Sequence, residues 1–74
     1  MYNDESIKID FPMPEELSET VKLLNQYAAG TTVDDSLNFE TQRDNLEIYS
    51  KGAYFDKKIT AEQLDLLWRK YGMR

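Results

Sequence analysis

The side chains that most often perform catalysis are absent from this sequence. Its 74 residues include neither histidine nor cysteine, so the commonest general base, the commonest zinc ligand and any thiolate or disulfide are missing. Carboxylates such as Glu15 and Glu19 lie one helical turn apart, yet no nucleophile with an adjacent base accompanies them. A chain of this length can also hardly enclose a substrate pocket. We therefore expect no enzymatic activity, no catalytic residue and no cofactor.

Four acidic residues lie close together in the middle of the chain and offer oxygen atoms of the kind that hard cations prefer. They are Asp34, Asp35, Glu40 and Asp44. Calcium-binding loops need a regular alternation of ligands and a glycine at the turn, and neither occurs here. We therefore expect no metal site. Thr32, Asp34, Asp35 and Ser36 are instead candidates for the N-cap of a following helix.

Aromatic and basic side chains alternate near the end of the chain, a pattern also found on surfaces that bind nucleic acids. They are Tyr54, Phe55, Lys57, Lys58, Trp68, Arg69, Lys70 and Tyr71. Trp68 shares a helical face with Leu64 and Leu67, which favours a place in the hydrophobic core. The net charge of -5 also weakens attraction to phosphate. We therefore interpret Trp68 as a core residue and expect no nucleic acid as a partner.

The composition is typical of one small folded domain over residues 1–74. Hydrophobic residues make up 41% and charged residues 31%, and a chain this short supports a single core. Residues 1–50 hold eleven acidic side chains against three basic ones, whereas residues 51–74 hold six basic against three acidic. The balance is thus -8 in the first part and +3 in the second. No apolar stretch approaches the roughly 20 residues that span a bilayer, and no signal-peptide pattern is present, so we expect a cytoplasmic protein without membrane contact.

A short extended arm precedes the helices. Ile7, Ile9 and Phe11 alternate with polar residues, which is the period-two pattern of an extended segment with one buried face. The polar residues 1–6 are expected to be disordered. Because a lone strand leaves its backbone donors unpaired, the arm at residues 7–11 must either pair with a second chain, giving a homodimer, or lie across its own helices.

Three helices follow, so the expected fold is mainly α: a small three-helix domain behind the N-terminal arm. The predicted ranges are about 14–29, 35–52 and 60–71. The first has Pro14 at its start and Gly30 as a left-handed stop. Thr60 and Gln63 predict a capping box at the start of the third. The sequence does not determine the last residue of the second helix, because Gly52 costs about 1 kcal/mol inside a helix.

The predicted core consists of one apolar face from each helix. Its members are Leu17, Val21, Leu24, Leu46, Tyr49, Leu64, Leu67, Trp68 and Tyr71. On the second helix the predicted line runs through Leu46, Tyr49 and Ala53, with Phe39 one to two turns earlier and Ile48 at its flank.

The start of the chain resembles the strand-to-helix entry of ribbon-helix-helix proteins. Residues 7–17 read IKIDFPMPEEL, an alternating segment followed by proline, acidic residues and a leucine, and the resemblance covers about residues 7–29. It implies a dimer whose paired strands read DNA through outward side chains, here Lys8 and Asp10. Asp10 departs from the family pattern, because an acidic side chain repels phosphate.

The end of the chain is similar to the closing helix of many small uncharacterised helical proteins from phages and mobile elements of Gram-positive bacteria. The likeness rests on KITAEQL at residues 58–64 with Leu67, Tyr71 and Gly72, and it covers roughly residues 45–72. It implies an accessory role through protein contacts, and it implies no known catalytic chemistry for this chain.

Three hypotheses of function follow. In the first, a small acidic accessory protein, derived from a phage or mobile element, exposes a groove or apolar patch to an unidentified protein partner. The alternative is a dimeric ribbon-helix-helix-like DNA-binding regulator or antitoxin, with Lys8 contacting DNA. A second alternative is an acidic inhibitor that mimics nucleic acid, which requires the acidic side chains of residues 1–50 to gather on one face.

Overall fold

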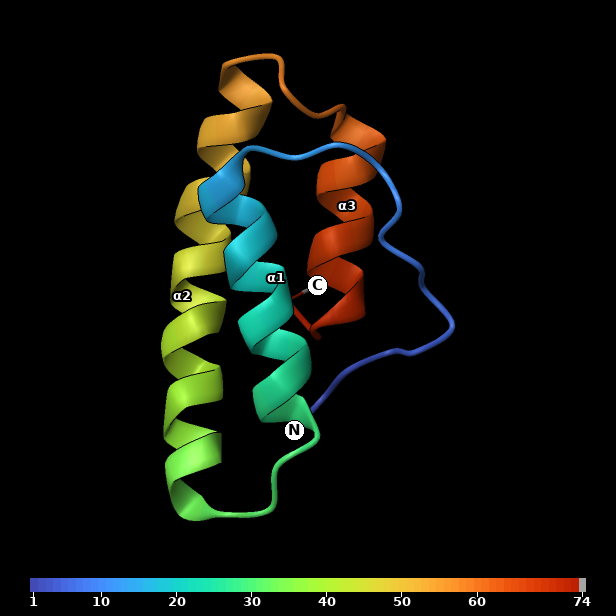
Figure 1. Cartoon of the computed structure of the whole chain (residues 1–74). Helices are drawn as coiled ribbons and strands as arrows, with labels where there is room; N and C mark the ends of the chain where they lie inside the picture. Colours follow the sequence, from blue (N-terminus) through green and yellow to red (C-terminus); the bar gives the residue numbers. More distant parts are fainter. Residues whose placement is uncertain (74) are drawn as a thin grey trace.

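The computed structural model describes residues 1–73 and shows a mainly α fold. Its helices are α1 (Glu15–Ala28), α2 (Val33–Phe55) and α3 (Ala61–Lys70), and the described residues contain no β-strand. Both α1 and α3 pack against α2, while the segment before α1 forms an arm along the outside of the helices (Figure 1). The prediction of a small three-helix domain is confirmed.

A short loop joins α1 to α2, which lie antiparallel (Figure 1). Thr32 is the N-cap of α2: its hydroxyl accepts a hydrogen bond from the Asp35 N–H at 3.0 Å, and the Asp35 carboxylate accepts one from the Thr32 N–H at 3.2 Å. This reciprocal pair is a capping box. The left-handed stop predicted at Gly30 is wrong, because its φ is not positive. Glycine is required there for space, since a Cβ atom would collide with the Asp35 carboxylate.

The second helix is longer than the predicted 35–52, because it begins at Val33 and ends at Phe55. Gly52 lies inside it, exposed, and apart from its chain neighbours and the adjacent helix backbone no atom lies within 4 Å of the place a Cβ would occupy. The helix is instead closed by Lys57, whose φ of 61° is left-handed. Here the Lys58 N–H donates to the Ala53 carbonyl at 2.8 Å, as in a Schellman motif.

The capping box expected at the start of α3 is present. The Thr60 hydroxyl accepts from the Gln63 N–H at 3.1 Å, and the Gln63 side chain accepts from the Thr60 N–H at 2.9 Å. Beyond the C-cap residue Tyr71, Gly72 has a φ of 72°, the left-handed conformation in which glycine is favoured.

The core lies between the three helices. Its buried hydrophobic members are Leu17, Val21, Leu24, Phe39, Leu46, Ala53, Ile59, Leu67 and Tyr71. Leu64 and Trp68 are partly buried against them. The placement of Tyr49 in the core is wrong, since its side chain is 41% exposed. The neighbouring Ser50 is fully buried instead, because its hydroxyl receives the indole N–H of Trp68 from α3.

The N-terminal arm lies across its own helices. Residues 1–6, expected to be disordered, are instead held at the end of α3, where the Asp4 N–H donates to the Lys70 carbonyl at 2.7 Å. Farther along, Ile9 and Phe11 are partly buried against the core. Of the two alternatives for residues 7–11, this structure therefore has the intramolecular one.

Candidate functional site

The outer face of α2 carries a row of exposed hydrophobic side chains, which we call the outer stripe. It consists of Val33, Leu37, Ile48 and Phe55, whose exposed fractions are 77%, 63%, 64% and 78%. At 100° per residue these four positions lie within about 60° of one another, roughly opposite the buried line of α2. The exposed residues Asp44 and Lys51 fall within the same arc, so the outer stripe is a row of hydrophobic positions separated by charged ones.

An outer apolar face is unusual for a helix on the surface of a small domain. Such a helix normally turns one apolar face to the core and a polar face to water. Single exposed hydrophobic residues are ordinary, whereas aligned groups mark surfaces that contact other molecules. At 1.5 Å per residue the stripe extends over about 33 Å, the length of the whole helix.

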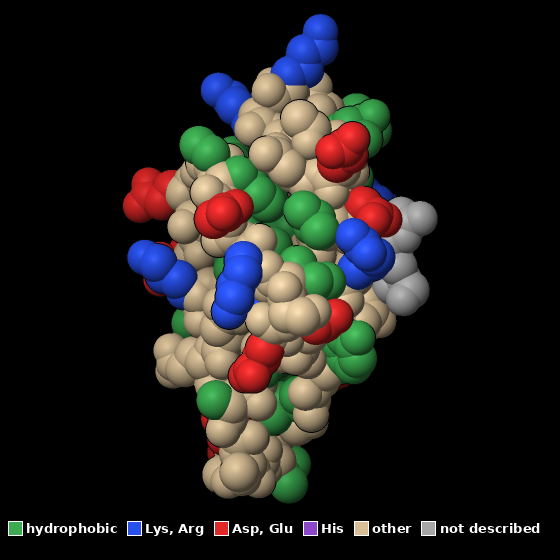
Figure 2. Space-filling model, turned by 90° about the vertical axis from the view of Figure 1, so that its right-hand side faces the viewer, with side chains coloured by type: hydrophobic (Ala, Val, Ile, Leu, Met, Phe, Trp, Pro, Cys, Tyr) green, Lys and Arg blue, Asp and Glu red, His purple; other side chains and the backbone are tan. Residues whose placement is uncertain are grey.

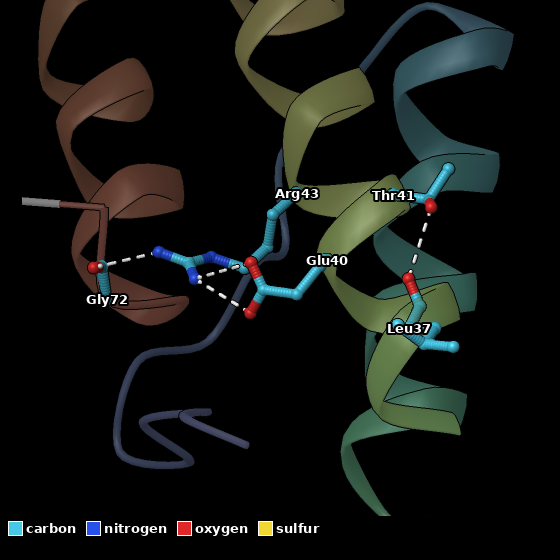
Figure 3. Close-up of polar contacts among 5 residues, drawn as sticks. All are labelled: Leu37, Glu40, Thr41, Arg43 and Gly72. Atoms are coloured by element: carbon cyan, nitrogen blue, oxygen red, sulfur yellow. Dashed lines mark hydrogen bonds and ion pairs between the residues drawn. The ribbon is translucent and has the colours of Figure 1, made fainter. Parts of the chain in front are cut away.

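Thr41 lies between the two halves of the stripe, one turn after Leu37. Its hydroxyl donates to the Leu37 carbonyl oxygen at 3.1 Å, within the same helix (Figure 3). That hydroxyl proton is therefore already used, and Thr41 does not break the stripe with an unsatisfied donor.

The charges on α2 and its following turn differ between the two ends. Residues 33–44 carry four acidic side chains and one basic one, a balance of -3, while residues 45–58 carry two acidic and three basic, a balance of +1. Asp34 is exposed in the first turn, and Lys51 is half exposed toward the other end. The outer stripe is thus bordered by negative charge at its start and by net positive charge at its end.

Arg43 belongs to a different side of α2. Its guanidinium donates to the Gly72 carbonyl at 3.1 Å and lies 3.2 Å from the Glu40 carboxylate. Figure 3 shows this side chain reaching toward the end of the chain, away from Leu37 and Thr41. Arg43 therefore ties α2 to the turn after α3 and contributes no charge to the outer stripe.

The arm side of the molecule contains the most enclosed polar contacts. The Lys70 ammonium, on a side chain that is largely buried, donates to the carbonyl oxygens of Asp4 and Ile7 at 3.1 and 3.0 Å. Burial, followed by the nearby charge of Lys8, lowers the pKa of Lys70. The hydroxyl and N–H of Ser6 donate to the Asp4 carboxylate and lower its pKa. These contacts close the arm on the helices.

The exposed surface on this side is mixed in charge. Figure 2 shows Lys and Arg side chains interspersed with Asp and Glu, with hydrophobic side chains between them. Neither positive nor negative charge covers the whole of this face. It therefore differs from the outer stripe of α2, which is defined by aligned hydrophobic side chains.

Lys8, the DNA-contacting candidate, is exposed on the arm. Ribbon-helix-helix recognition would require the arms of two chains to pair as strands, and here Ile9 and Phe11 pack on the core of their own chain. The DNA-binding hypothesis stays a prediction that these contacts do not support.

The acidic side chains of residues 1–50 are distributed along the molecule. Because α1 and α2 are antiparallel, Glu15 and Glu16 at the start of α1 lie at the opposite end from Asp34 and Asp35 at the start of α2 (Figure 1). Within residues 1–73, no three acidic side chains converge as possible ligands of a metal ion. No helix in the same range has the length and apolar character to cross a membrane.

The outer stripe was not identified from the sequence. The sequence pattern predicts Ile48 at the flank of the core face and assigns Leu37 no role. The available signal was the spacing of 4, 11 and 7 residues from Val33 to Phe55, since each step returns to nearly the same side of a helix. Comparison of the chain with protein-family models, curated proteins and solved structures gives no significant match.

Proposed function

We propose that the protein is a small non-enzymatic accessory protein that acts through protein contacts made by the outer stripe of α2. The observation that carries this proposal is the alignment of four exposed hydrophobic side chains opposite the buried face of the same helix. Burial of a large hydrophobic side chain is favourable by on the order of 1.5–3 kcal/mol, and these side chains do not gain this free energy while they remain in water. Contact with another protein would recover part of it.

Features elsewhere in the molecule are consistent with this proposal. The contacts of Lys70 with the arm and of Arg43 with Gly72 tie α3 to the arm and to α2, and they leave the outer stripe of α2 uncovered. A rigid helix that presents aligned apolar side chains is a recurrent way of contacting a protein. The face of the arm side that Figure 2 shows has basic and acidic side chains mixed together. Such a face attracts the phosphates of a nucleic acid less than an extended basic surface would.

The test is capture of binding proteins from an extract of the cells that produce the chain. The full-length protein is compared with the double variant Leu37→Gln and Ile48→Gln, which removes the centre of the stripe. The matched control is Asn38→Gln, which changes an exposed residue on another side of the same helix. We expect the wild type and the control to capture similar amounts of protein. The amount captured by the double variant should be at least tenfold lower.

Circular dichroism establishes that the double variant keeps its helices, so that loss of binding is not loss of folding. The same amount of captured protein on all three forms would contradict the proposal. Equal loss in the Asn38→Gln control would assign the contact to another part of α2.

A further inference from the structure

We infer that the centre of the outer stripe binds an amphipathic helix of another protein, one whose hydrophobic side chains are bordered by arginine or lysine. The inference rests on the proposed function and names the chemistry of the partner. Three features of the structure carry it: the straight line of the central hydrophobic residues, the carboxylates beside that line, and a hollow that these carboxylates line.

Three exposed carboxylates lie among and beside the central hydrophobic residues of the stripe. They belong to Glu40, Asp44 and Glu47, and the side chains of Glu40 and Glu47 are 62% and 53% exposed. At 100° per residue the three lie within about 60° of one another, and Asp44 lies within about 40° of both Leu37 and Ile48. The centre of the stripe is therefore a hydrophobic line with an acidic border.

The chain itself neutralises this acidic border only in part. Glu40 lies 3.2 Å from the Arg43 guanidinium, whereas Glu47 lies as far as 4.0 Å from the Lys51 ammonium. Asp44 has no ion pair or side-chain hydrogen bond within residues 1–73. It also lies one helical turn from Glu40 and from Glu47, and like charges at these spacings repel each other. A cation supplied by a partner would relieve this repulsion.

The same three carboxylates line a hollow of about 250 Å³ between α2 and the segment after α3. Arg43 and Met73 complete its lining, so the hollow has three acidic side chains against one basic one, a balance of -2. The Arg43 guanidinium is already held by the Gly72 carbonyl and by Glu40 (Figure 3). A long basic side chain can lay its apolar stem on Met73 and place its charged end among the carboxylates. Arginine is favoured, because its planar guanidinium forms paired hydrogen bonds with a carboxylate.

The hydrophobic line next to the hollow has the shape that a helix can follow. Leu37 and Ile48 are 11 positions apart, and 11 positions return to within about 20° on a helix. The line therefore runs nearly parallel to the axis of α2 over about 16 Å. A second helix lying alongside at a small crossing angle contacts such a line with side chains from successive turns. Its basic residues must adjoin these side chains to reach the hollow.

The acidic border disfavours two other occupants of this face. A nucleic acid would bring its phosphates against the carboxylates. A second copy of α2, paired through Leu37 and Ile48, would bring the carboxylates of Glu40 and Asp44 of both copies together. A basic helix has neither conflict.

Binding of a synthetic peptide to the full chain tests the inference. The probe is a fluorescently labelled, alanine-based helical peptide of about 18 residues, with leucines along one side and arginines directly beside them. One control has the same composition with the arginines on the opposite side of the helix, and a second has glutamate in place of arginine. Fluorescence anisotropy should give a Kd on the order of 10 µM for the probe and values at least tenfold higher for both controls.

Substitutions in the chain locate the contact. Asp44→Asn keeps the size of the side chain and removes its charge, so it should weaken binding of the probe about fivefold. Glu19→Gln, at an exposed position of α1, makes the same change in net charge and should leave the affinity unchanged. Because Asp44→Asn removes the repulsion from Glu40 and Glu47, it should not lower the temperature of thermal unfolding. Weaker binding is then not a loss of folding.

The results separate the inference from the proposed function. Equal binding of the probe and either control peptide, or equal affinity of Asp44→Asn and the wild type, would overturn the inference. So would a doubled mass of the chain alone in light scattering that disappears in the double variant Leu37→Gln and Ile48→Gln, since the occupant would then be a second copy. If the probe does not bind but this double variant still loses the protein captured from the extract, the proposed function stands and the partner has a different chemistry. If neither the probe nor a captured protein depends on these two residues, both proposals are contradicted.

Discussion

The indole N–H of Trp68 in α3 donates a hydrogen bond to the hydroxyl of Ser50 in α2, with 2.9 Å between nitrogen and oxygen. The Ser50 hydroxyl in turn lies 3.3 Å from the Glu47 carbonyl of its own helix. A serine is thereby placed in the buried face of α2 without an unsatisfied group, and the two helices are fixed in register.

We expect Ser50→Ala to destabilise the protein by about 1 kcal/mol, because the partly buried indole N–H loses its acceptor. Urea unfolding followed by circular dichroism measures the change. Trp68→Phe and the double variant complete a mutant cycle, in which the two effects should be less than additive. Full additivity would show that the two side chains are not energetically coupled.

Leu24→Ala should cost about 3 kcal/mol, because Leu24 has no exposed surface and its truncation leaves a cavity in the core between the three helices. Leu37→Ala, a change of the same size on the outer stripe, should alter the unfolding free energy of the monomer by less than about 0.5 kcal/mol. Thermal unfolding at low protein concentration compares the two. Similar losses in both variants would contradict the division of hydrophobic residues into core and outer stripe.

Lys70→Met should release the arm while the helices remain. The variant keeps the apolar stem but cannot donate to the carbonyl oxygens of Asp4 and Ile7. Amide hydrogen exchange should become at least tenfold faster at Asp4, whose N–H donates to the Lys70 carbonyl, with little change in the middle of α1. Lys22→Met, at an exposed position of α1, is the control. Unchanged exchange at Asp4 would mean that the ammonium does not hold the arm.

Tyr71→Phe should change how stability depends on alkaline pH. Burial raises the pKa of Tyr71, so the folded chain keeps a proton that the unfolded chain releases above about pH 10. The contribution of this group is therefore complete below pH 10 and is lost as the pH rises further. The lowered pKa of Lys70 acts in the opposite direction below its ordinary value of 10.5 and is common to both forms.

At pH 7 the Tyr71→Phe variant should be less stable by about 1 kcal/mol, because the 2.6 Å hydrogen bond from the Tyr71 hydroxyl to Asn25 is lost. The difference from the wild type should shrink as the pH rises from 9 to 11. Urea unfolding at each pH measures it, and a constant difference would contradict the pKa assignment.

Lys57→Gly should stabilise the protein by about 0.5–1 kcal/mol, because Lys57 has the left-handed conformation that glycine adopts without strain. Lys58→Gly removes the same charge at the next position and should give no such gain. Thermal unfolding of the two variants decides this, and equal effects would attribute the change to charge alone.

Much of the fold could be predicted from local sequence signals. The capping box at Thr60 and Gln63 located the start of α3, and the spacing of Leu17, Val21 and Leu24 identified the buried face of α1. These signals are complete within one or two turns of helix, so they do not depend on the rest of the chain.

The errors arose where tertiary contacts override a local preference. Gly52 suggested a helix end, yet the true end is set by Lys57, a residue without any stop signal in the sequence. The predicted core position Tyr49 is exposed, and the neighbouring Ser50 is buried, where its hydroxyl accepts the indole N–H of Trp68 from another helix. The sequence pattern does not reveal the outer stripe, because charged residues such as Asp44 and Lys51 lie among its hydrophobic positions and obscure their spacing.

The contacts of Lys70 with Asp4 and Ile7 also constrain the order of folding. They join residues 66 and 63 positions apart, whereas α1 and α2 are neighbours in sequence and can pair as a hairpin early. During synthesis the arm emerges from the ribosome before the three helices, but it cannot be fastened until Lys70 has been added. Until then Ile9 and Phe11 lack the completed surface on which they pack, so the arm reaches its final position after the helices that follow it.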